Sequence, residues 1–325
     1  MTISSSDARG ERLERLSADS GQFAILALDH VSSFAATVRP IAPESLSPDE
    51  MYGLKERLIS ELAKNSTAVL IDPAFALNRL ESEAPALPVG LILGIEDGDY
   101  DDAEISPRLL PGWTVERAAQ FGADAVKISF YFDPDSDTSE AEAFVAETVR
   151  QCEISGLPLF CEPLVRLAGS GDTRRKVLDG VRRFGNMGVD VLKIQFPGDT
   201  DSSSSRDAWV DACGEVTEQG SSPWALLSEG RDYEVFRELL AVACQQGASG
   251  FLGGRAIWGG AVTGADAFAV YAERLLELRS IAVTQGASWK ARKAISKPAT
   301  EVDSLRPPGG GFILIDGAAP RQRSH

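Results

Sequence analysis

Short apolar runs alternate with helix-like patterns along most of this chain. Each run is rich in Val, Ile, Leu, Ala or Phe, as in strands of a parallel sheet that are buried on both faces. We count eight of them, at residues 23–28, 68–71, 89–95, 123–132, 156–165, 190–197, 223–230 and 248–255. Helical patterns are expected at 7–18, 48–64, 113–121, 136–155, 172–187, 207–217, 232–246 and 264–285, with a further helical stretch to about 293. Proline and serine indicate a loop between the first run and the helix at 48–64.

Strands that alternate with helices favour a parallel sheet. Eight such units within about 260 residues match a (β/α)8 TIM barrel, so we expect an α/β fold of this kind with a short N-terminal helix. A doubly wound open sheet is the competing architecture. No G-x-G-x-x-G pattern follows the first run, which weakens the case for a dinucleotide site.

The expected domain organisation has three parts. Residues 1–21 form an N-terminal helical cap, residues 22–293 the barrel, and residues 294–325 a C-terminal tail. The tail contains Pro and Gly at 307–311, which disfavour a helix or strand, followed by an apolar stretch at 312–315. We expect a flexible tail, or one that docks on a neighbouring surface.

Charge and cysteine usage narrow the classes of function. The 325 residues carry 32 basic and 48 acidic side chains, a net charge of −16, which opposes nucleic acid and anionic membranes as partners. No apolar run approaches membrane-spanning length, and the polar opening residues show no signal peptide. Four widely spaced cysteines fit reduced thiols in the cytoplasm. With two histidines in the chain and no CxxC pair, we expect no transition-metal site and no cofactor. Magnesium held by carboxylates stays open as an alternative.

Polar residues interrupt several apolar runs at comparable depth. Asp29 follows the first run, Lys127 lies in the fourth, Glu162 in the fifth and Lys193 in the sixth, and Ser228 ends the seventh. Catalytic groups of a (β/α)8 barrel lie at the C-terminal ends of its strands. Asp29 could instead be a cap, and Lys127 and Glu162 a structural pair. Four buried ionisable groups are nevertheless costly unless they serve a function.

Lys193 is the most informative of these residues. Burial disfavours a charged lysine, so Lys193 is either one half of an ion pair or a working amine. Lys127, Glu162 and Lys193 fall on three consecutive strands, which lie about 4.8 Å apart. A second cation favours a nucleophilic amine, and a carboxylate between two lysines can move protons. This arrangement fits carbonyl chemistry through a Schiff base.

Glycines at the last two strands predict an anion site. Gly230 follows Ser228, and Gly254 precedes Arg255, so both loops offer backbone N–H groups close to a planar cation. The loops after strands seven and eight form the usual phosphate site of such barrels. Ordinary glycine-rich turns are the alternative. Arg166, after the fifth run, could hold a second anionic group or could be a plain surface arginine.

These motifs resemble the tagatose 1,6-bisphosphate aldolase family of class I aldolases, which also includes bacterial sulfofructosephosphate aldolase. The resemblance runs from about residue 23 to 293 and rests on the order and spacing of the motifs. Those motifs are residues 27–29, 69–72, 123–127, 160–162, 190–193, 227–230, 248–258 and 287–290.

The resemblance implies a role for each candidate residue. Lys193 would form the Schiff base, Glu162 would be the acid and base, and Lys127 and Asp29 would assist them. Ser228, Gly230, Gly254 and Arg255 would hold the phosphate of the dihydroxyacetone phosphate half. The implied substrate is a small sugar phosphate.

The chain departs from the family pattern at three places. His30-Val31 stands where the family has Gln-Arg, so His30 and Arg166 become the candidates for the far end of the substrate. Gln195 replaces a glutamate, and Glu229 replaces a small residue.

We therefore predict a cytoplasmic class I aldolase that cleaves a phosphorylated ketose to dihydroxyacetone phosphate and an aldehyde. Sulfofructosephosphate cleavage is one alternative. A second is an isomerase or epimerase that uses Glu162 as a base without an imine. A third is a degenerate aldolase that acts as a sugar-phosphate-responsive regulator. The sequence leaves open whether the chain forms a homo-oligomer.

Overall fold

Eight parallel strands close into a barrel at the centre of the molecule. The computed structural model describes residues 5–38, 46–79, 87–97, 106–166, 172–200, 205–260, 262 and 268–293. The strands are β1 (Phe23–Leu28), β2 (Ala68–Ile71), β3 (Gly90–Gly94), β4 (Ala125–Tyr131), β5 (Leu159–Leu164), β6 (Val191–Ile194), β7 (Trp224–Leu227) and β8 (Gly250–Gly253). They pair in chain order, and β8 pairs with β1. The predicted (β/α)8 barrel is therefore confirmed, and an open sheet is excluded.

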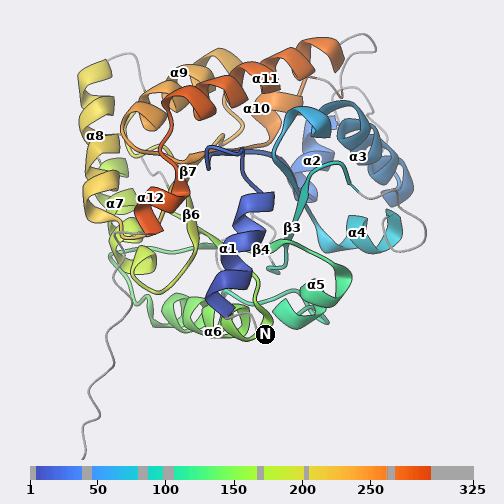
Figure 1. Ribbon diagram of the computed structural model, residues 1–325, viewed down its shortest axis with the longest axis horizontal. Helices are drawn as coiled ribbons and strands as arrows, with labels where there is room; N and C mark the ends of the chain where they lie inside the picture. Colours follow the sequence, from blue (N-terminus) through green and yellow to red (C-terminus); the bar gives the residue numbers. More distant parts are fainter. Residues whose placement is uncertain are drawn as a thin grey trace, which may run out of the picture.

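Helices pack around the strands, most of them as an outer ring, while α1 lies over the middle of the barrel (Figure 1). They are α1 (Ser5–Arg15), α2 (Ser32–Val38), α3 (Pro48–Leu62), α4 (Pro73–Arg79), α5 (Val115–Phe121), α6 (Ser139–Ser155), α7 (Thr173–Gly185), α8 (Arg206–Gln219), α9 (Tyr233–Gln245), α10 (Arg255–Trp258), α11 (Phe268–Gln285) and α12 (Trp289–Lys293), with the 3₁₀ turn η1 (Ala63–Asn65) after α3. No helix of the described ranges is long and apolar enough to cross a membrane.

Three short helices were not predicted from the sequence. Helix α2 falls where a loop was expected, α4 follows the second run directly, and α10 has only four residues. The start of α4 nevertheless carries a recognisable signal. Pro73 occupies its first position, and the Asp72 side chain accepts a hydrogen bond from the Phe75 N–H at 2.9 Å. The predicted C-terminal tail, residues 294–325, lies outside the described residues.

Alternation along each strand sorts the side chains into two apolar layers. In β1, Phe23, Ile25 and Ala27 belong to the core inside the barrel, whereas Leu26 and Leu28 pack between the barrel and the helices. The other strands alternate in the same way, as expected for side chains of period two. Counting along each strand therefore predicts which residues at its C-terminal end point into the barrel.

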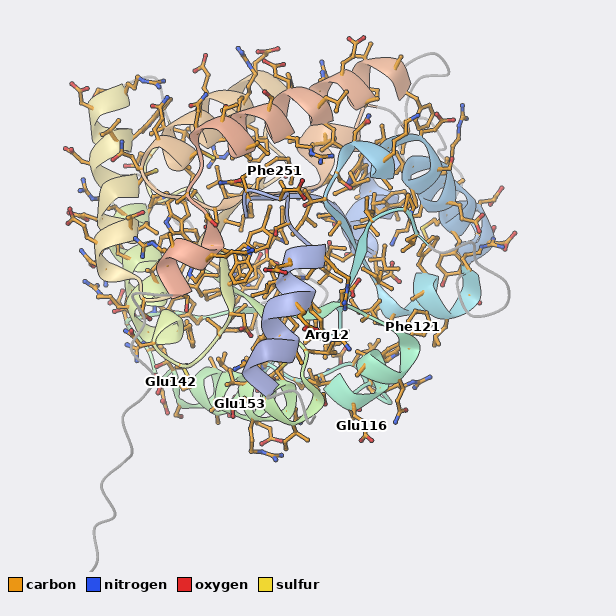
Figure 2. The ribbon with its side chains drawn as sticks, viewed as in Figure 1. Arg12, Glu116, Phe121, Glu142, Glu153 and Phe251 are labelled. Atoms are coloured by element: carbon orange, nitrogen blue, oxygen red, sulfur yellow. The ribbon has the colours of Figure 1, made fainter. Side chains whose placement is uncertain are left out.

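Helix α1 covers the N-terminal end of the barrel. Leu13 and Leu16 are fully buried in the same core as Phe160 and Trp289. Figure 2 shows Arg12 over the middle of the barrel, and its guanidinium donates to the Ala123 carbonyl at 2.8 Å. We call α1 and its buried leucines the N-terminal plug.

Ion pairs fasten the N-terminal plug to the strands. Arg9 donates to Asp190 at 3.2 Å, and the same carboxylate oxygen accepts the Leu159 N–H at 3.0 Å. Asp124 makes the same two kinds of contact: Arg15 Nε donates to its Oδ1 at 2.8 Å, and the Leu91 N–H of β3 donates to its Oδ2 at 3.1 Å. Each aspartate thus joins α1 to two neighbouring strands.

Candidate active site

A cavity of about 270 Å³ opens at the C-terminal ends of the strands. Asp29, Glu162 and Lys193 contribute to its wall, as do His30 and Arg255. These residues are far apart in the sequence but were all proposed as site residues from it. The fold therefore brings the predicted residues together at one place.

The alternation of the strands explains this convergence. Phe160 and Val191 point into the barrel and lie side by side in the parallel register of β5 and β6. Two residues further along each strand, Glu162 and Lys193 also point inward and meet at the cavity. Lys127 pairs in register with Phe160 rather than with Glu162, so it lies one layer deeper.

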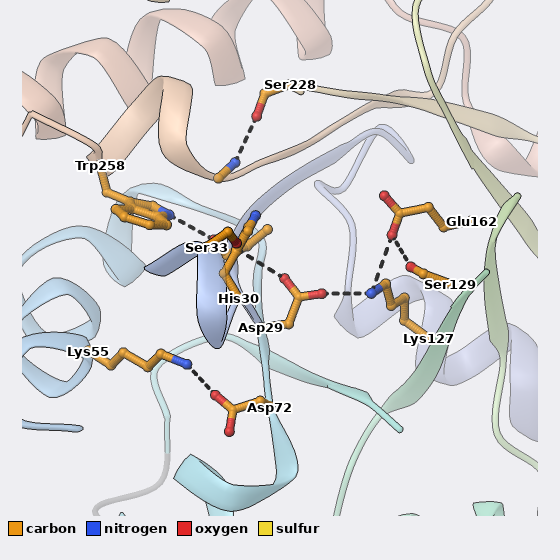
Figure 3. A network of polar contacts seen from close by, with 12 residues as sticks. Asp29, His30, Ser33, Lys55, Asp72, Lys127, Ser129, Glu162, Ser228 and Trp258 are labelled. Atoms are coloured by element: carbon orange, nitrogen blue, oxygen red, sulfur yellow. Dashed lines mark hydrogen bonds and ion pairs between the residues drawn. The ribbon is translucent and has the colours of Figure 1, made fainter. Parts of the chain in front are cut away.

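Lys193 and Lys127 share the carboxylate of Glu162. The Lys193 ammonium donates to Glu162 Oε2 at 2.9 Å, and Lys127 Nζ lies 3.3 Å from the same oxygen. Lys127 also donates to Asp29 Oδ2 at 2.8 Å (Figure 3). Ser129 donates a further hydrogen bond to Glu162. The three strand residues predicted to lie within mutual reach do so.

The two lysines differ in exposure. Lys193 is 6% exposed and lines the cavity, whereas Lys127 is fully buried beneath it. A ligand in the cavity can therefore meet the Lys193 amine directly. Lys127 acts on such a ligand only through the carboxylates that it holds.

Glu96 is a further member of this network that the sequence analysis missed. It hydrogen-bonds and pairs with Lys127, and its side chain is 7% exposed. The alternation of inward and outward side chains along β3 does predict that Glu96 points into the barrel. Ile92 of β3 points into the barrel, so Gly94 and Glu96 follow on the same side. Glu96 escaped notice because it lies beyond the apolar run rather than within it.

A second buried pair near the site has a structural role. Lys55 of α3 pairs with Asp72 at the end of β2, apart from the lysine–carboxylate network (Figure 3). Neither residue lines the cavity. Because Asp72 also caps α4, the pair holds two helices against β2.

Electrostatics keep the two carboxylates of the cavity ionised. Burial raises the pKa of Asp29, but attraction to Lys127, Lys193 and His30 outweighs burial and leaves that pKa well below its usual range. The pKa of Glu162 is also lowered. Burial raises it, and Lys193, Lys127 and the Ser129 hydrogen bond together lower it further. Both carboxylates can thus accept protons or hydrogen bonds.

His30 is held as a neutral imidazole. Burial is the main cause and lowers its pKa to about 4, although Asp29, 3.5 Å away, acts in the opposite direction. The ring packs edge-on against Trp258. A Cβ on Gly254 would come within 2.6 Å of the His30 ring, which explains the glycine there. His30 thus lies at the β8 side of the cavity.

The predicted anion-binding residues also line the cavity. Ser228 Oγ accepts the Gly254 N–H at 3.1 Å, which leaves the serine hydroxyl able to donate. The guanidinium of Arg255 lies against Gly230, where a Cβ would meet Cζ at 3.0 Å. Arg255 Nε is buried and has no hydrogen-bond partner within the described ranges. A buried donor without a partner is costly unless a ligand satisfies it.

Arg166 lies apart from this group. Its guanidinium is 5.7 Å from the ring centre of Tyr131, which lines the cavity at the end of β4. Arg166 itself is exposed and does not line the cavity. His30 and Arg166, which the sequence analysis grouped together, are therefore at different sides of the mouth.

Metal ligands and thiols are two further classes of reactive group. The described residues contain no group of three or more His, Cys, Asp or Glu side chains that could hold a metal ion. All four cysteines are buried and free. Burial raises the pKa of Cys213 and of Cys244 to about 12, which disfavours the nucleophilic thiolate.

Comparison with known sequences gives consistent matches. The model of a family described as DeoC/LacD family aldolase matches residues 23–260. Tagatose 1,6-diphosphate aldolase of Streptococcus pneumoniae R6 is 28% identical over 321 residues, covering 86% of this chain and 97% of that protein. The enzyme of the same name from Lactococcus lactis is 28% identical over 286 residues, covering 79% and 86%.

Solved structures agree in fold. An archaeal fructose 1,6-bisphosphate aldolase superposes with a TM-score of 0.61 at 20% identity, covering 84% of this chain and 98% of that one. Fructose-bisphosphate aldolase from Plasmodium falciparum gives a TM-score of 0.66 at 15% identity, covering 87% and 96%. At such identities the likeness establishes the shared barrel.

Proposed function

We propose a reaction for this chain from one premise: it belongs to the DeoC/LacD family of aldolases. The reaction is Schiff-base cleavage of a phosphorylated ketose, such as tagatose 1,6-bisphosphate, to dihydroxyacetone phosphate and an aldehyde. The observation that carries this proposal is the Lys193 amine at the cavity wall, 2.9 Å from Glu162 Oε2. Relatives named tagatose 1,6-diphosphate aldolase support the choice of substrate.

The first half of the reaction forms the imine. Lys193, after giving a proton to Glu162, attacks the ketone carbon and forms a carbon–nitrogen bond. The nitrogen of the adduct gives up a second proton to the adduct oxygen, and Glu162 returns the first. The oxygen then carries two protons and leaves as water, and the protonated imine remains on Lys193. The hydrogen bond between the two side chains supplies the short path that such proton transfer needs.

The second half breaks the carbon–carbon bond. A base removes the proton from the hydroxyl on the far carbon of the bond that breaks, which is the carbon that becomes the aldehyde, and we assign this step to Glu162. The bonding electrons move to the protonated imine, so an enamine stays on Lys193 and the aldehyde leaves. Protonation of the enamine carbon and addition of water then release dihydroxyacetone phosphate.

Asp29 and Lys127 support these steps in different ways. Asp29 lines the cavity, and its buried Oδ1 has no hydrogen-bond partner among the described residues, so it can accept one from a substrate hydroxyl. Lys127 stays beneath the cavity, and its positive charge keeps Asp29 and Glu162 ionised.

The phosphate of the dihydroxyacetone phosphate half is assigned to the β7–β8 side of the cavity. Arg255 supplies a planar cation with a buried donor, and Ser228 supplies a hydroxyl. Gly230 and Gly254 keep the backbone close to this anion. His30 contacts the substrate as a neutral group, and Arg166 is the candidate for a second anionic group at the opposite side of the mouth.

Borohydride trapping tests the proposal directly. The enzyme is treated with dihydroxyacetone phosphate and borohydride, and the modified peptide is identified by mass spectrometry. We expect an adduct on Lys193 that is absent from Lys193→Ala. If Lys193→Ala cleaved substrate at the wild-type rate, the proposed mechanism would be wrong.

The same measurements separate the alternatives. An isomerase or epimerase that uses Glu162 without an imine gives no adduct, and a regulator binds sugar phosphate without turnover. A panel of tagatose, fructose and sulfofructose phosphates then identifies the ketose by its kcat/KM.

A further inference from the structure

Glu229 has an unusual backbone for a residue with a side chain. It is the one non-glycine residue with a positive φ in the described ranges, at 50°. This left-handed conformation is unfavourable for a residue with a Cβ, so surrounding contacts must hold it in place. Glu229 also lines the cavity, between Ser228 and Gly230.

A chain of hydrogen bonds holds the Glu229 side chain from two sides. Gln195 Nε2 donates to Glu229 Oε1 at 2.9 Å, while Gln195 Oε1 accepts the Val165 N–H at 2.7 Å. Arg231 donates to Glu229 Oε2 from Nη2 at 2.8 Å and from Nε at 3.1 Å. Arg231 Nη1 also donates to Thr200 Oγ1 at 2.6 Å. We call Val165, Gln195, Glu229, Arg231 and Thr200 the rim clamp.

The rim clamp ties together the loops that follow three successive strands. Val165 follows β5, Gln195 and Thr200 follow β6, and Glu229 and Arg231 follow β7. Gln195 is 7% exposed and Val165 is 2% exposed, so solvent competes little for the bonds at this end of the clamp. The loop after β7 therefore depends on its neighbours for its shape.

The backbone at Glu229 decides how two flanking residues meet the anion side of the cavity. Ser228 Oγ is joined to the Gly254 N–H, and Gly230, with φ of +68°, lies flat against the Arg255 guanidinium. Rotation at Glu229 would move one of these contacts relative to the other. A fixed Glu229 thus keeps the Ser228 hydroxyl and the Arg255 guanidinium directed at the same bound anion.

We infer that Glu229 is a positioning residue, which the rim clamp locks in a left-handed conformation so that Ser228, Gly230 and Arg255 form one phosphate site. The inference rests on the proposed function for the identity of the anion. The Glu229 carboxylate does not bind the phosphate, because two anions repel. Arg231 neutralises it instead.

Two single variants and their combination test the rim clamp. Glu229→Gly accepts the left-handed backbone without cost but releases Gln195 and Arg231. Arg231→Met removes the guanidinium and keeps most of the side-chain length. For each we expect KM for the ketose phosphate, and Kd for inorganic phosphate measured by calorimetry, to rise about tenfold. We expect kcat to stay within about twofold, since the lysine–carboxylate network is untouched.

The double variant distinguishes a clamp from two independent contacts. Members of one hydrogen-bonded unit give non-additive effects, so Glu229→Gly with Arg231→Met should bind phosphate no more weakly than either single variant. Multiplied effects would overturn the inference. Arg237→Met, on the exposed face of α9 and paired with Glu234 and Glu277, is the matched control and should leave both constants unchanged.

The outcomes separate this inference from the proposed function. In the first case the wild type cleaves ketose phosphates, and circular dichroism shows that Glu229→Gly and Arg231→Met are folded. If both variants then keep the wild-type KM and Kd, the clamp is wrong and the aldolase proposal stands. If the wild type cleaves none but both variants weaken phosphate binding, the clamp stands and the reaction is wrong. A wild type that does not bind inorganic phosphate overturns the clamp.

Discussion

The two ends of the barrel both hold buried carboxylates against cations, but they hold them differently. At the N-terminal end, Asp190 is fastened to Arg9 and to the Leu159 backbone N–H. At the C-terminal end, Glu162 is held, within the part of the chain that the structure describes, by the side chains of Ser129, Lys127 and Lys193. A carboxylate bonded to backbone fixes the spacing of two strands. One that is bonded to side chains can exchange partners when a substrate enters.

This difference suggests that the N-terminal end of the barrel serves stability and the C-terminal end serves activity. The N-terminal plug adds apolar burial and fixed contacts, and no group there faces the cavity. The C-terminal network concentrates charge beside an open volume of about 270 Å³. Substitutions should therefore affect activity at one end and stability at the other, with Lys127 affecting both.

Glu162→Gln should give the largest effect on activity. Loss of the residue that moves protons should lower kcat by about 10²–10⁴-fold, measured in a coupled aldehyde assay. The fold should persist, because Lys127 keeps its contact with Asp29. Glu140→Gln, an exposed change on α6, is the control. If Glu162→Gln kept the wild-type kcat, a residue other than Glu162 would have to move the protons.

Lys127→Met should lower both stability and activity, because Lys127 supports both. The change leaves Asp29, Glu96 and Glu162 buried without their shared cation. Removing one partner of a buried ion pair costs about 3–5 kcal/mol, which urea unfolding would measure. Lys290→Met, which breaks the exposed pair with Glu14, should cost at most about 1 kcal/mol. Equal losses for the two variants would contradict this account.

Leu13→Ala, at the N-terminal end, should lower stability without changing activity. Leu13 is fully buried in the barrel core, and such truncations cost about 2–5 kcal/mol. We expect a lower unfolding midpoint and an unchanged kcat at a temperature where the variant is folded. Leu276→Ala, at a side chain that is 47% exposed, should change stability by about 0.5 kcal/mol or less. A large fall in kcat for folded Leu13→Ala would show that the ends are coupled.

The smallest predicted effect concerns pH. In the folded protein the pKa of His30 is lowered to about 4, below the ordinary value of 6.5. As pH falls through this window, the unfolded state takes up a proton that the folded state does not, so stability falls. We expect His30 to account for roughly 1–3 kcal/mol of the loss between pH 6.5 and 4. Unfolding of His30→Gln at a series of pH values should show a shallower decline, and an identical decline would contradict the assignment.

Much of the barrel could be predicted from the apolar runs. The bounds 23–28 and 68–71 coincide with β1 and β2, since short apolar runs closed by polar residues leave few alternatives. Helix α2 was missed because its serine-rich start is typical of a loop, whereas in the structure Phe34 and Val38 pack into the core and stabilise the helix. Tertiary contacts there outweigh local preference.

The candidate site was predictable in its strand residues but not in its loops. Asp29, Glu162 and Lys193 lie where alternation directs them into the barrel. Sequence order could not reveal that Gln195 bonds Glu229, because that contact depends on the backbone conformation of the loop after β7. Nor could it reveal that the Arg166 guanidinium lies 5.7 Å from the ring centre of Tyr131 rather than at the cavity wall, because that depends on the path of the chain after β5.

The N-terminal plug also constrains the order in which the chain folds. Helix α1 precedes all eight strands in the chain, yet its Arg9 contacts Asp190, 181 residues away, and Ser17, just after the helix, contacts Trp289, 272 residues away. Closing such long loops costs entropy that only a formed partner surface can offset. During synthesis, α1 can therefore dock only after β6 and α12 have left the ribosome. Helix α1 thus docks on a surface that is built from later parts of the chain.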